Sequence, residues 1–282
     1  MKGENYCFLK VRLCILLLSF LASINANAQY PSSKSAGIAS DAVVFIAAKF
    51  RLPGLVAGNY DTRYATGFLV SDQKKIYLVT TKHAFQNMVP GQYGMICDSI
   101  FISSSTADRL SSIHYTTTTG LKQNAGGCMF SDDKVDLAIL TLNSIIFDPL
   151  LKSLRKNGRK PILLSAFQTD KQIKPADTMY HAGYMVYQHP ELGLAYSNAL
   201  GWAKWGIYDK KETSTSFLAD IGLPLAGTGS PVVVSERLVG IAINRNRDEK
   251  LPQDLQFSKQ GTVIKSSVIA SLLRKLQSME NK

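Results

Sequence analysis

Histidine, cysteine and long apolar runs are scarce in this chain of 282 residues, and each scarcity excludes a class of protein. The four histidines lie far apart, and neither an HExxH nor a CxxC motif occurs, so we expect no metal site. No low-complexity tract or internal repeat is present, which argues against a solenoid. Only one segment is apolar enough, over enough residues, to be compared with a membrane-spanning helix.

That segment lies near the N-terminus and reads LCILLLSFLA (13–22). Basic residues precede it, and the small residues of ANA follow it. This pattern predicts a secretory signal peptide over residues 1–28, cleaved before Gln29, with an uncleaved membrane anchor as the alternative. We therefore expect a secreted or periplasmic protein that has no membrane attachment after cleavage.

Two cysteines, Cys97 and Cys128, remain after removal of that segment. An even number in an oxidising compartment is compatible with one disulfide. The spacing does not show whether the Cα atoms come within bonding range, so two separate buried thiols are an equal alternative.

The formal net charge of +11 raises the question of an anionic partner. The basic residues are scattered along the chain, and the basic stretch LKSLRKNGRK has the character of a solvated helix face. We therefore expect no nucleic-acid groove. Binding to anionic polymers of the cell envelope is a weaker alternative that rests on net charge alone.

Short β-rich runs separated by turns make up most of the chain after residue 40. A helix is predicted near 148–158, with Asp148 as its cap, Pro149 in its first turn and Gly158 at its exit. A second helix is predicted near 268–276 from its apolar spacing.

The layout predicts an all-β fold of two tandem antiparallel six-stranded β-barrels, with a mid-chain helix and a C-terminal helix. The first barrel and the linker helix would occupy 29–160, and the second barrel and the final helix 161–282. A single β-sandwich is the alternative, although it explains a capped helix at the midpoint less readily.

Three stretches contain residues that could perform chemistry. In YLVTTKHAF, His83 follows a β-branched strand, where a general base would be held rigidly. In DDKVDLAIL, Asp136 is predicted to open an apolar strand and could accept a hydrogen bond from a histidine ring. In LPLAGTGSPVVV, small residues around Thr228 would let backbone N–H groups converge on an oxyanion. Each stretch alone has an ordinary structural explanation.

In this order the three stretches resemble trypsin-like (chymotrypsin-fold) serine peptidases, most of all the bacterial exported type. The matching segments are TGFLV with YLVTTKHAF, VDLAIL, YHAGYM and GTGSPVVV followed by VGI. The resemblance covers most of the chain, from about Ala42 to Leu276. It implies an endopeptidase that hydrolyses peptide bonds in peptide or protein substrates without a cofactor.

The resemblance also implies a role for each site residue. His83 would act as general base and then acid, and Asp136 would orient it. Thr228 would be the nucleophile, because counting back from Gly-Ser-Pro places the family's serine there; Ser230 is the less favoured alternative. Backbone amides of Ala226 and Thr228 would form the oxyanion hole.

Three departures from the family pattern favour a second hypothesis. The methyl group of Thr228 restricts its side chain, Ala226 replaces a glycine, and Ile243 stands where a small polar residue is usual behind the aspartate. The second hypothesis is a catalytically impaired pseudoprotease that acts as a binding or scaffold module. The sequence gives no indication of the oligomeric state.

Overall fold

The structure is a computed structural model that describes residues 33–51, 60–86, 97, 99–104, 113–117, 127–132, 134–168, 177–189, 193–204, 213–219, 221, 227–247 and 257–280. The chain divides into two compact units, 1–33 and 34–282, and every element named below belongs to the second unit. The predicted signal peptide, 1–28, lies outside the described residues. Among the described helices, none is both long enough and apolar enough to cross a membrane.

The first sheet has eight strands among the described residues, and its hydrogen-bonded neighbours are antiparallel except for one pair. In spatial order its strands are β5 (Ile113–Thr117), β4 (Ser99–Ser103), β1 (Val43–Arg51), β2 (Tyr60–Ser71), β3 (Ile76–Thr80), β7 (Ala138–Thr141) and β6 (Cys128–Phe130). The exception is β8 (Ile162–Leu163), which pairs in parallel with β2.

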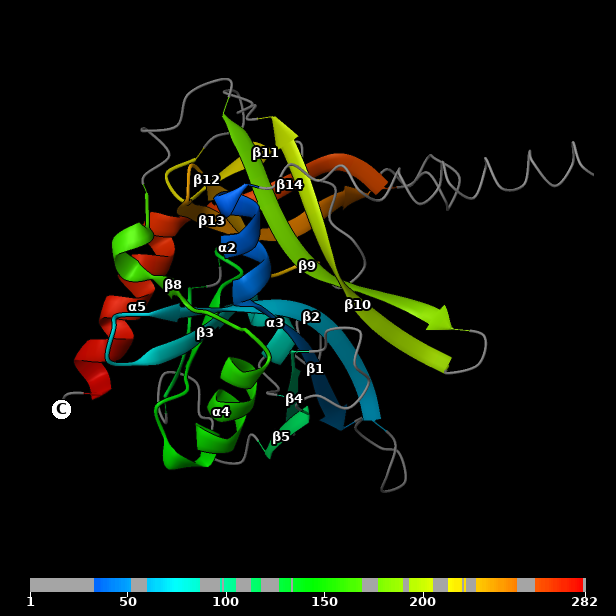
Figure 1. The fold of residues 1–282 in the computed structure, drawn as a ribbon, viewed down its shortest axis with the longest axis vertical. Coiled ribbons are helices and arrows are strands. Elements are labelled where there is room, and N and C mark those ends of the chain that lie inside the picture. Colours follow the sequence, from blue (N-terminus) through cyan, green and yellow to red (C-terminus); the bar gives the residue numbers. More distant parts are fainter. Residues whose placement is uncertain are drawn as a thin grey trace, which may run out of the picture. The chain divides into compact units, whose positions relative to one another are not determined.

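The second sheet has six described strands, all antiparallel to their neighbours (Figure 1). In spatial order they are β10 (Gly193–Lys204), β9 (Thr178–His189), β12 (Ser230–Val234), β13 (Arg237–Arg247), β14 (Phe257–Lys265) and β11 (Ser216–Ala219). The strand-rich pattern of the sequence is therefore confirmed at the level of two antiparallel sheets.

Helices lie before, between and after the strands. They are α2 (Lys34–Ala42), α3 (Lys82–Phe85), α4 (Asp148–Lys156) and α5 (Ser266–Glu280), with 3-10 turns η2 (Ile145–Phe147) and η3 (Leu164–Ala166). The mid-chain helix and the C-terminal helix are both confirmed. Buried Leu150 and Leu154 hold α4, and Ile269, Leu273 and Leu276 hold α5, as the apolar spacing predicts.

Some local predictions are wrong, for identifiable reasons. Asp148 does not cap α4, because η2 runs directly into the helix and Phe147 occupies the cap position. Gly158 does adopt the predicted left-handed conformation, with a φ of 75°. Residues 161–167 have the composition of a strand, but only Ile162 and Leu163 form one, β8. The 3-10 turn η3 follows it, and Phe167 then makes an isolated parallel bridge with Leu238. The helix α2 was not predicted; it packs against β9 and β12.

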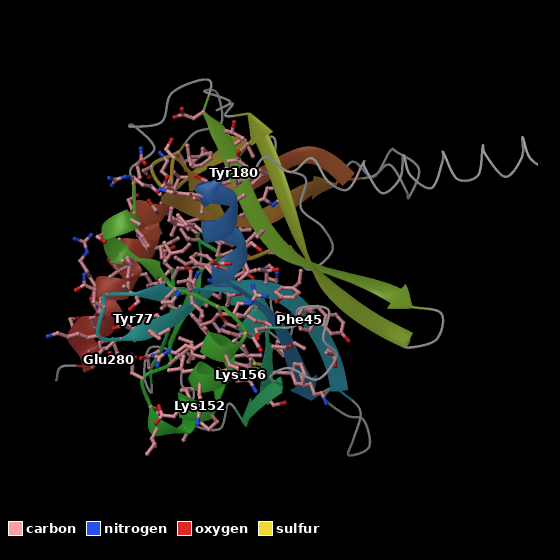
Figure 2. All side chains as sticks on the ribbon, in the orientation of Figure 1. Phe45, Tyr77, Lys152, Lys156, Tyr180 and Glu280 are labelled. Carbon is pink, nitrogen blue, oxygen red and sulfur yellow. The ribbon has the colours of Figure 1, made fainter. Side chains whose placement is uncertain are left out.

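One hydrophobic core joins the two sheets. Its buried members include Phe45 and Tyr77 from the first sheet and Tyr180 and Tyr184 from the second, and Figure 2 labels three of these four side chains. The rings of Phe45 and Tyr184 lie 5.5 Å apart between centroids, in the tilted geometry that aromatic pairs prefer. The shared core holds the two sheets together within the unit 34–282.

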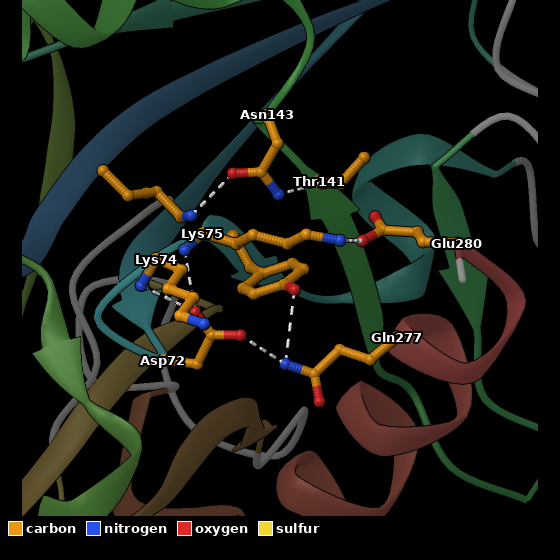
Figure 3. A network of polar contacts seen from close by, with 9 residues as sticks. Asp72, Lys74, Lys75, Thr141, Asn143, Gln277 and Glu280 are labelled. Atoms are coloured by element: carbon orange, nitrogen blue, oxygen red, sulfur yellow. Dashed lines mark hydrogen bonds and ion pairs between the residues drawn. The ribbon is translucent and has the colours of Figure 1, made fainter.

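A polar network fastens α5 to the β2–β3 turn (Figure 3). The Gln277 side-chain amide donates to Asp72 Oδ2 at 2.7 Å and to the Tyr77 hydroxyl at 3.3 Å. Lys75 Nζ lies 2.7 Å from Glu280 Oε2, and this hydrogen bond raises the pKa of Lys75. The last helix of the chain is thereby attached to the first sheet.

Candidate active site

His83 lies on the short helix α3, directly after β3. The residues of β3 from Tyr77 to Thr80 are fully buried, and Thr81 continues the extended backbone. In α3 the side chains of Lys82, Ala84 and Phe85 are buried, whereas the His83 side chain is 37% exposed. The burial of its neighbours fixes the backbone of His83 and leaves its ring at the surface.

Asp136 lies in a tight turn that precedes β7. The Ser131 hydroxyl donates to the Val135 carbonyl and accepts from the Leu137 amide at 3.2 Å. Val135 and Leu137 are buried on either side, and the Asp136 side chain is 26% exposed. Asp136 was expected to open the strand, but β7 begins two residues later, at Ala138.

The structure brings His83 and Asp136 together through two hydrogen bonds. The His83 backbone N–H donates to Asp136 Oδ1 at 2.9 Å, and His83 Nδ1 lies 2.5 Å from Asp136 Oδ2. Because an ionised carboxylate only accepts hydrogen bonds, this contact places the ring proton on Nδ1 and leaves Nε2 as the acceptor nitrogen.

The same contacts keep Asp136 ionised. Burial alone raises the pKa of this carboxyl, but the hydrogen bonds and the charge of His83 outweigh burial and hold the pKa below its ordinary value. A fixed, ionised carboxylate behind a histidine is the arrangement that a general base requires.

Thr228 lies in a tight loop, 227–230, that leads into β12. Gly229 has a φ of 98°, and its N–H donates to the Ala242 carbonyl at 2.7 Å. The Ser230 N–H donates to the Gly227 carbonyl at 3.1 Å, and the Ser230 hydroxyl donates to the same oxygen. This loop is the one in which a nucleophile was expected.

The two candidate hydroxyls have different environments. Ser230 is fully buried, and a Cβ added to Gly183 would lie 2.3 Å from its Oγ, so no space for a substrate exists there. Thr228 is partly exposed. The geometry therefore favours Thr228 over Ser230 as the residue that could meet a substrate.

Thr66, on β2, joins the Thr228 loop to the strand that precedes His83. The Thr66 N–H donates to the Thr228 carbonyl at 2.9 Å, and the Thr80 hydroxyl donates to the Thr66 carbonyl at 2.8 Å. The Tyr184 N–H donates to Thr66 Oγ1 at 2.8 Å. Buried Thr66 therefore contacts the loop, β3 and β9 at once.

Glycine at 229 is required for this docking. A Cβ at that position would lie 1.8 Å from the Thr66 carbonyl oxygen, which is far inside the van der Waals limit. Only a residue without a side chain lets the loop approach β2 so closely.

The third contact of a catalytic triad is not formed in the structure. Among the described residues, no hydrogen bond joins the Thr228 hydroxyl to His83. No described residue accepts a hydrogen bond from the Thr228 backbone N–H. Ala226 lies outside the described residues. Ile243 is partly buried and packs against the shared core.

The two cysteines are buried thiols, so the disulfide alternative is not realised in the structure. Both belong to the hydrophobic cluster behind the first sheet. Burial, with a smaller contribution from the nearby Cys97, raises the pKa of Cys128 to about 12. A thiol with so high a pKa is unreactive at neutral pH.

Two other kinds of site were considered. Within the described part of the chain, no group of three or more histidine, cysteine or acidic side chains could hold a metal ion. A cavity of about 270 Å³ contains no residue of the candidate active site. Apolar residues that include Ile38, Ile162 and Ala166 line it, together with Asp41, Lys160 and Glu236.

Two residues of the site were not singled out from the sequence. Thr66 and Lys82 both lie inside motifs that the sequence made prominent, TGFLV and YLVTTKHAF. A lysine between buried positions is an unusual signal, since charged side chains are almost never fully buried without a partner. For Thr66 no local signal exists, because its partners come from three distant segments.

No family model matches the chain, and a search of curated proteins found no match.

Proposed function

We propose that the chain is an exported endopeptidase of the trypsin-like type, with Thr228 in place of the nucleophilic serine. The observation that carries the proposal is the pair of hydrogen bonds between His83 and Asp136, at 2.9 and 2.5 Å. The docking of the Thr228 loop on Thr66 supports it. In this proposal the two sheets belong to two tandem β-barrels, over 29–160 and 161–282. The first sheet departs from a six-stranded barrel, because it has eight described strands and one of them, β8, comes from the second range.

The proposed reaction is acyl transfer. Thr228 Oγ1 attacks the peptide carbonyl carbon while its proton passes to His83 Nε2, and the same proton then leaves with the amine product. Water hydrolyses the resulting ester with His83 again as base. The oxyanion would be held by backbone N–H groups of Ala226 and Thr228. The substrate would be a peptide or protein outside the cytoplasm, and no cofactor takes part.

The second candidate function is a pseudoprotease that binds but does not cleave. The observation that favours it is the absence, among the described residues, of a hydrogen bond between Thr228 and His83. The threonine methyl group restricts the side chain, and a misplacement of about 1 Å can reduce the rate roughly a hundredfold.

Thr228→Ser is the substitution that tests both candidates. We expect it to raise kcat/KM on casein by about a hundredfold, because the smaller side chain can reach His83. His83→Ala in each background is the control. Wild-type cleavage no greater than that of His83→Ala excludes the endopeptidase, and activity gained only with serine supports the pseudoprotease.

A second pair of variants identifies the nucleophile. Thr228→Ala should abolish hydrolysis, whereas Ser230→Ala should retain it, because the Ser230 hydroxyl is buried and bound to Gly227. The reverse result would assign the nucleophile to Ser230.

A further inference from the structure

Lys82, the residue before His83, is a lysine in the interior of the protein. It is only 2% exposed, although lysine is almost never buried without compensation. Its ammonium nitrogen Nζ donates a hydrogen bond to the backbone carbonyl of Asp132 at 3.0 Å. Burial of a charge is costly, and the place of the Asp132 carbonyl in the fold indicates what this burial achieves.

The accepting carbonyl belongs to the turn that presents Asp136. In that turn the Val135 N–H donates to the same carbonyl, and the Lys134 N–H donates to the Asp132 side chain at 3.0 Å. Lys82 therefore connects the α3 backbone to the turn at one point, and the His83–Asp136 contacts connect them at another.

We propose that Lys82 is a positioning residue that, from its buried site, fixes Asp132, in the turn that precedes β7, against α3 and so holds Asp136 against His83. The effect of Lys82 on catalysis rests on the proposed function, whereas the anchoring of the turn does not. Two anchors on one turn prevent the rotation that a single anchor would permit. A histidine held in this way keeps its Nε2 in one direction, as a general base must.

The charge of Lys82 acts in the same sense as its hydrogen bond. Among the described residues, His83 and Lys82 are the charged groups that lower the pKa of Asp136, and both favour the ionised carboxylate. An arginine could supply the same charge and donors, whereas a methionine of similar length would supply neither.

The primary test compares Lys82→Met with Lys134→Met by ¹³C NMR titration of the Asp136 carboxyl. Lys134 is the matched control, because it is an exposed lysine of the same turn. In Lys82→Met we expect the pKa of Asp136 to rise, since a positive charge and an anchor are both lost. In Lys134→Met and Lys82→Arg it should stay at the wild-type value. An unchanged pKa in Lys82→Met, or an equal rise in Lys134→Met, overturns the proposal.

A measurement on the wild-type protein covers the case in which Lys82→Met does not fold. The Lys82 ammonium hydrogens should give a ¹⁵N signal that is protected from exchange with water near neutral pH, because the group is buried and bonded. Loss of that signal on substitution to Arg assigns it. A wild-type spectrum without any protected lysine ammonium contradicts the proposal.

Activity supplies a further readout. In the Thr228→Ser background, Lys82→Met should lower kcat about tenfold while KM changes less than about twofold, because substrate contacts are untouched. If no variant hydrolyses casein, the proposed function fails, while the Asp136 titration still decides the role of Lys82.

Discussion

At the scale of single residues, the candidate site depends on close approaches that tolerate no additional atoms. Gly229 lies against the Thr66 carbonyl, and Gly183 lies against the Ser230 hydroxyl. Both glycines lie where the second sheet meets β2. The position of the Thr228 hydroxyl is therefore set by backbone packing, and small changes at these glycines should alter it.

Gly229→Ala should be strongly destabilising. The new Cβ would lie 1.8 Å from the Thr66 oxygen at a φ of 98°, so the loop must move. We expect a loss of at least about 3 kcal/mol in the free energy of unfolding, measured by urea denaturation. Gly158→Ala is the matched control: it has a φ of 75° with nothing within 4 Å, so it should cost only about 1 kcal/mol of backbone strain. Equal losses in the two variants would contradict the docking of the loop on Thr66.

At the scale of elements, α5 packs against the second sheet and also bonds to the first. It packs against β13 and β14, and its C-terminal turn bonds to the β2–β3 turn (Figure 3). Since β3 leads directly into the helix that bears His83, the network stabilises the strand that precedes His83.

Gln277→Ala tests this attachment. The variant removes a 2.7 Å bond to a carboxylate and a 3.3 Å bond to the buried Tyr77 hydroxyl. We expect a loss of about 1–2 kcal/mol in unfolding free energy and faster amide exchange in α5 and β3. Ser278→Ala is the control, because the Ser278 hydroxyl bonds only within the helix, to the Lys275 carbonyl. If amide exchange in Gln277→Ala becomes faster in α5 alone, with β3 unchanged, the network does not support β3.

At the scale of the whole molecule, the unit 34–282 contains a buried titratable side chain, His181, that is not part of the candidate site. His181 on β9 is 3% exposed, and no described residue pairs with its Nδ1. Burial lowers the pKa of His181 from 6.5 to about 4, so the ring is neutral in the folded protein near neutral pH.

Acid should therefore weaken the fold before the carboxylates titrate. Between about pH 6.5 and 4 the unfolded chain binds a proton at His181 that the folded chain does not, so stability falls as the pH falls. We expect a loss of about 2–3 kcal/mol in unfolding free energy between pH 7.5 and 4.5. The contribution of Asp136, whose pKa is lowered, is retained over this range and lost only at lower pH.

His181→Leu should remove most of that slope, while a comparison of pH 7.5 with 8.5 should show no change in either protein. Urea denaturation at each pH measures both. A slope that is the same in the variant would assign the acid sensitivity to other groups.

The sequence by itself determined the strand-rich architecture, the two main helices and the order of the candidate residues. Period-two and helical spacing of apolar residues, with Gly158 at a helix exit, are local signals that survive folding. The sequence was a less reliable guide where local strand propensity competes with the pairing that the tertiary fold permits. Residues 161–167 have strand composition, but only Ile162 and Leu163 pair with β2. The turn η3 interrupts the strand, and Phe167 bridges to Leu238 in the second sheet instead.

Only the tertiary structure decided how those candidates relate to one another. The His83–Asp136 bonds, the burial of Ser230 and the contacts of Thr66 and Lys82 all join segments far apart in the chain. No local pattern specifies such contacts, because each depends on which surfaces the shared core brings together. The residue types of the candidate site could thus be read from the sequence, but their orientation is a property of the packed sheets.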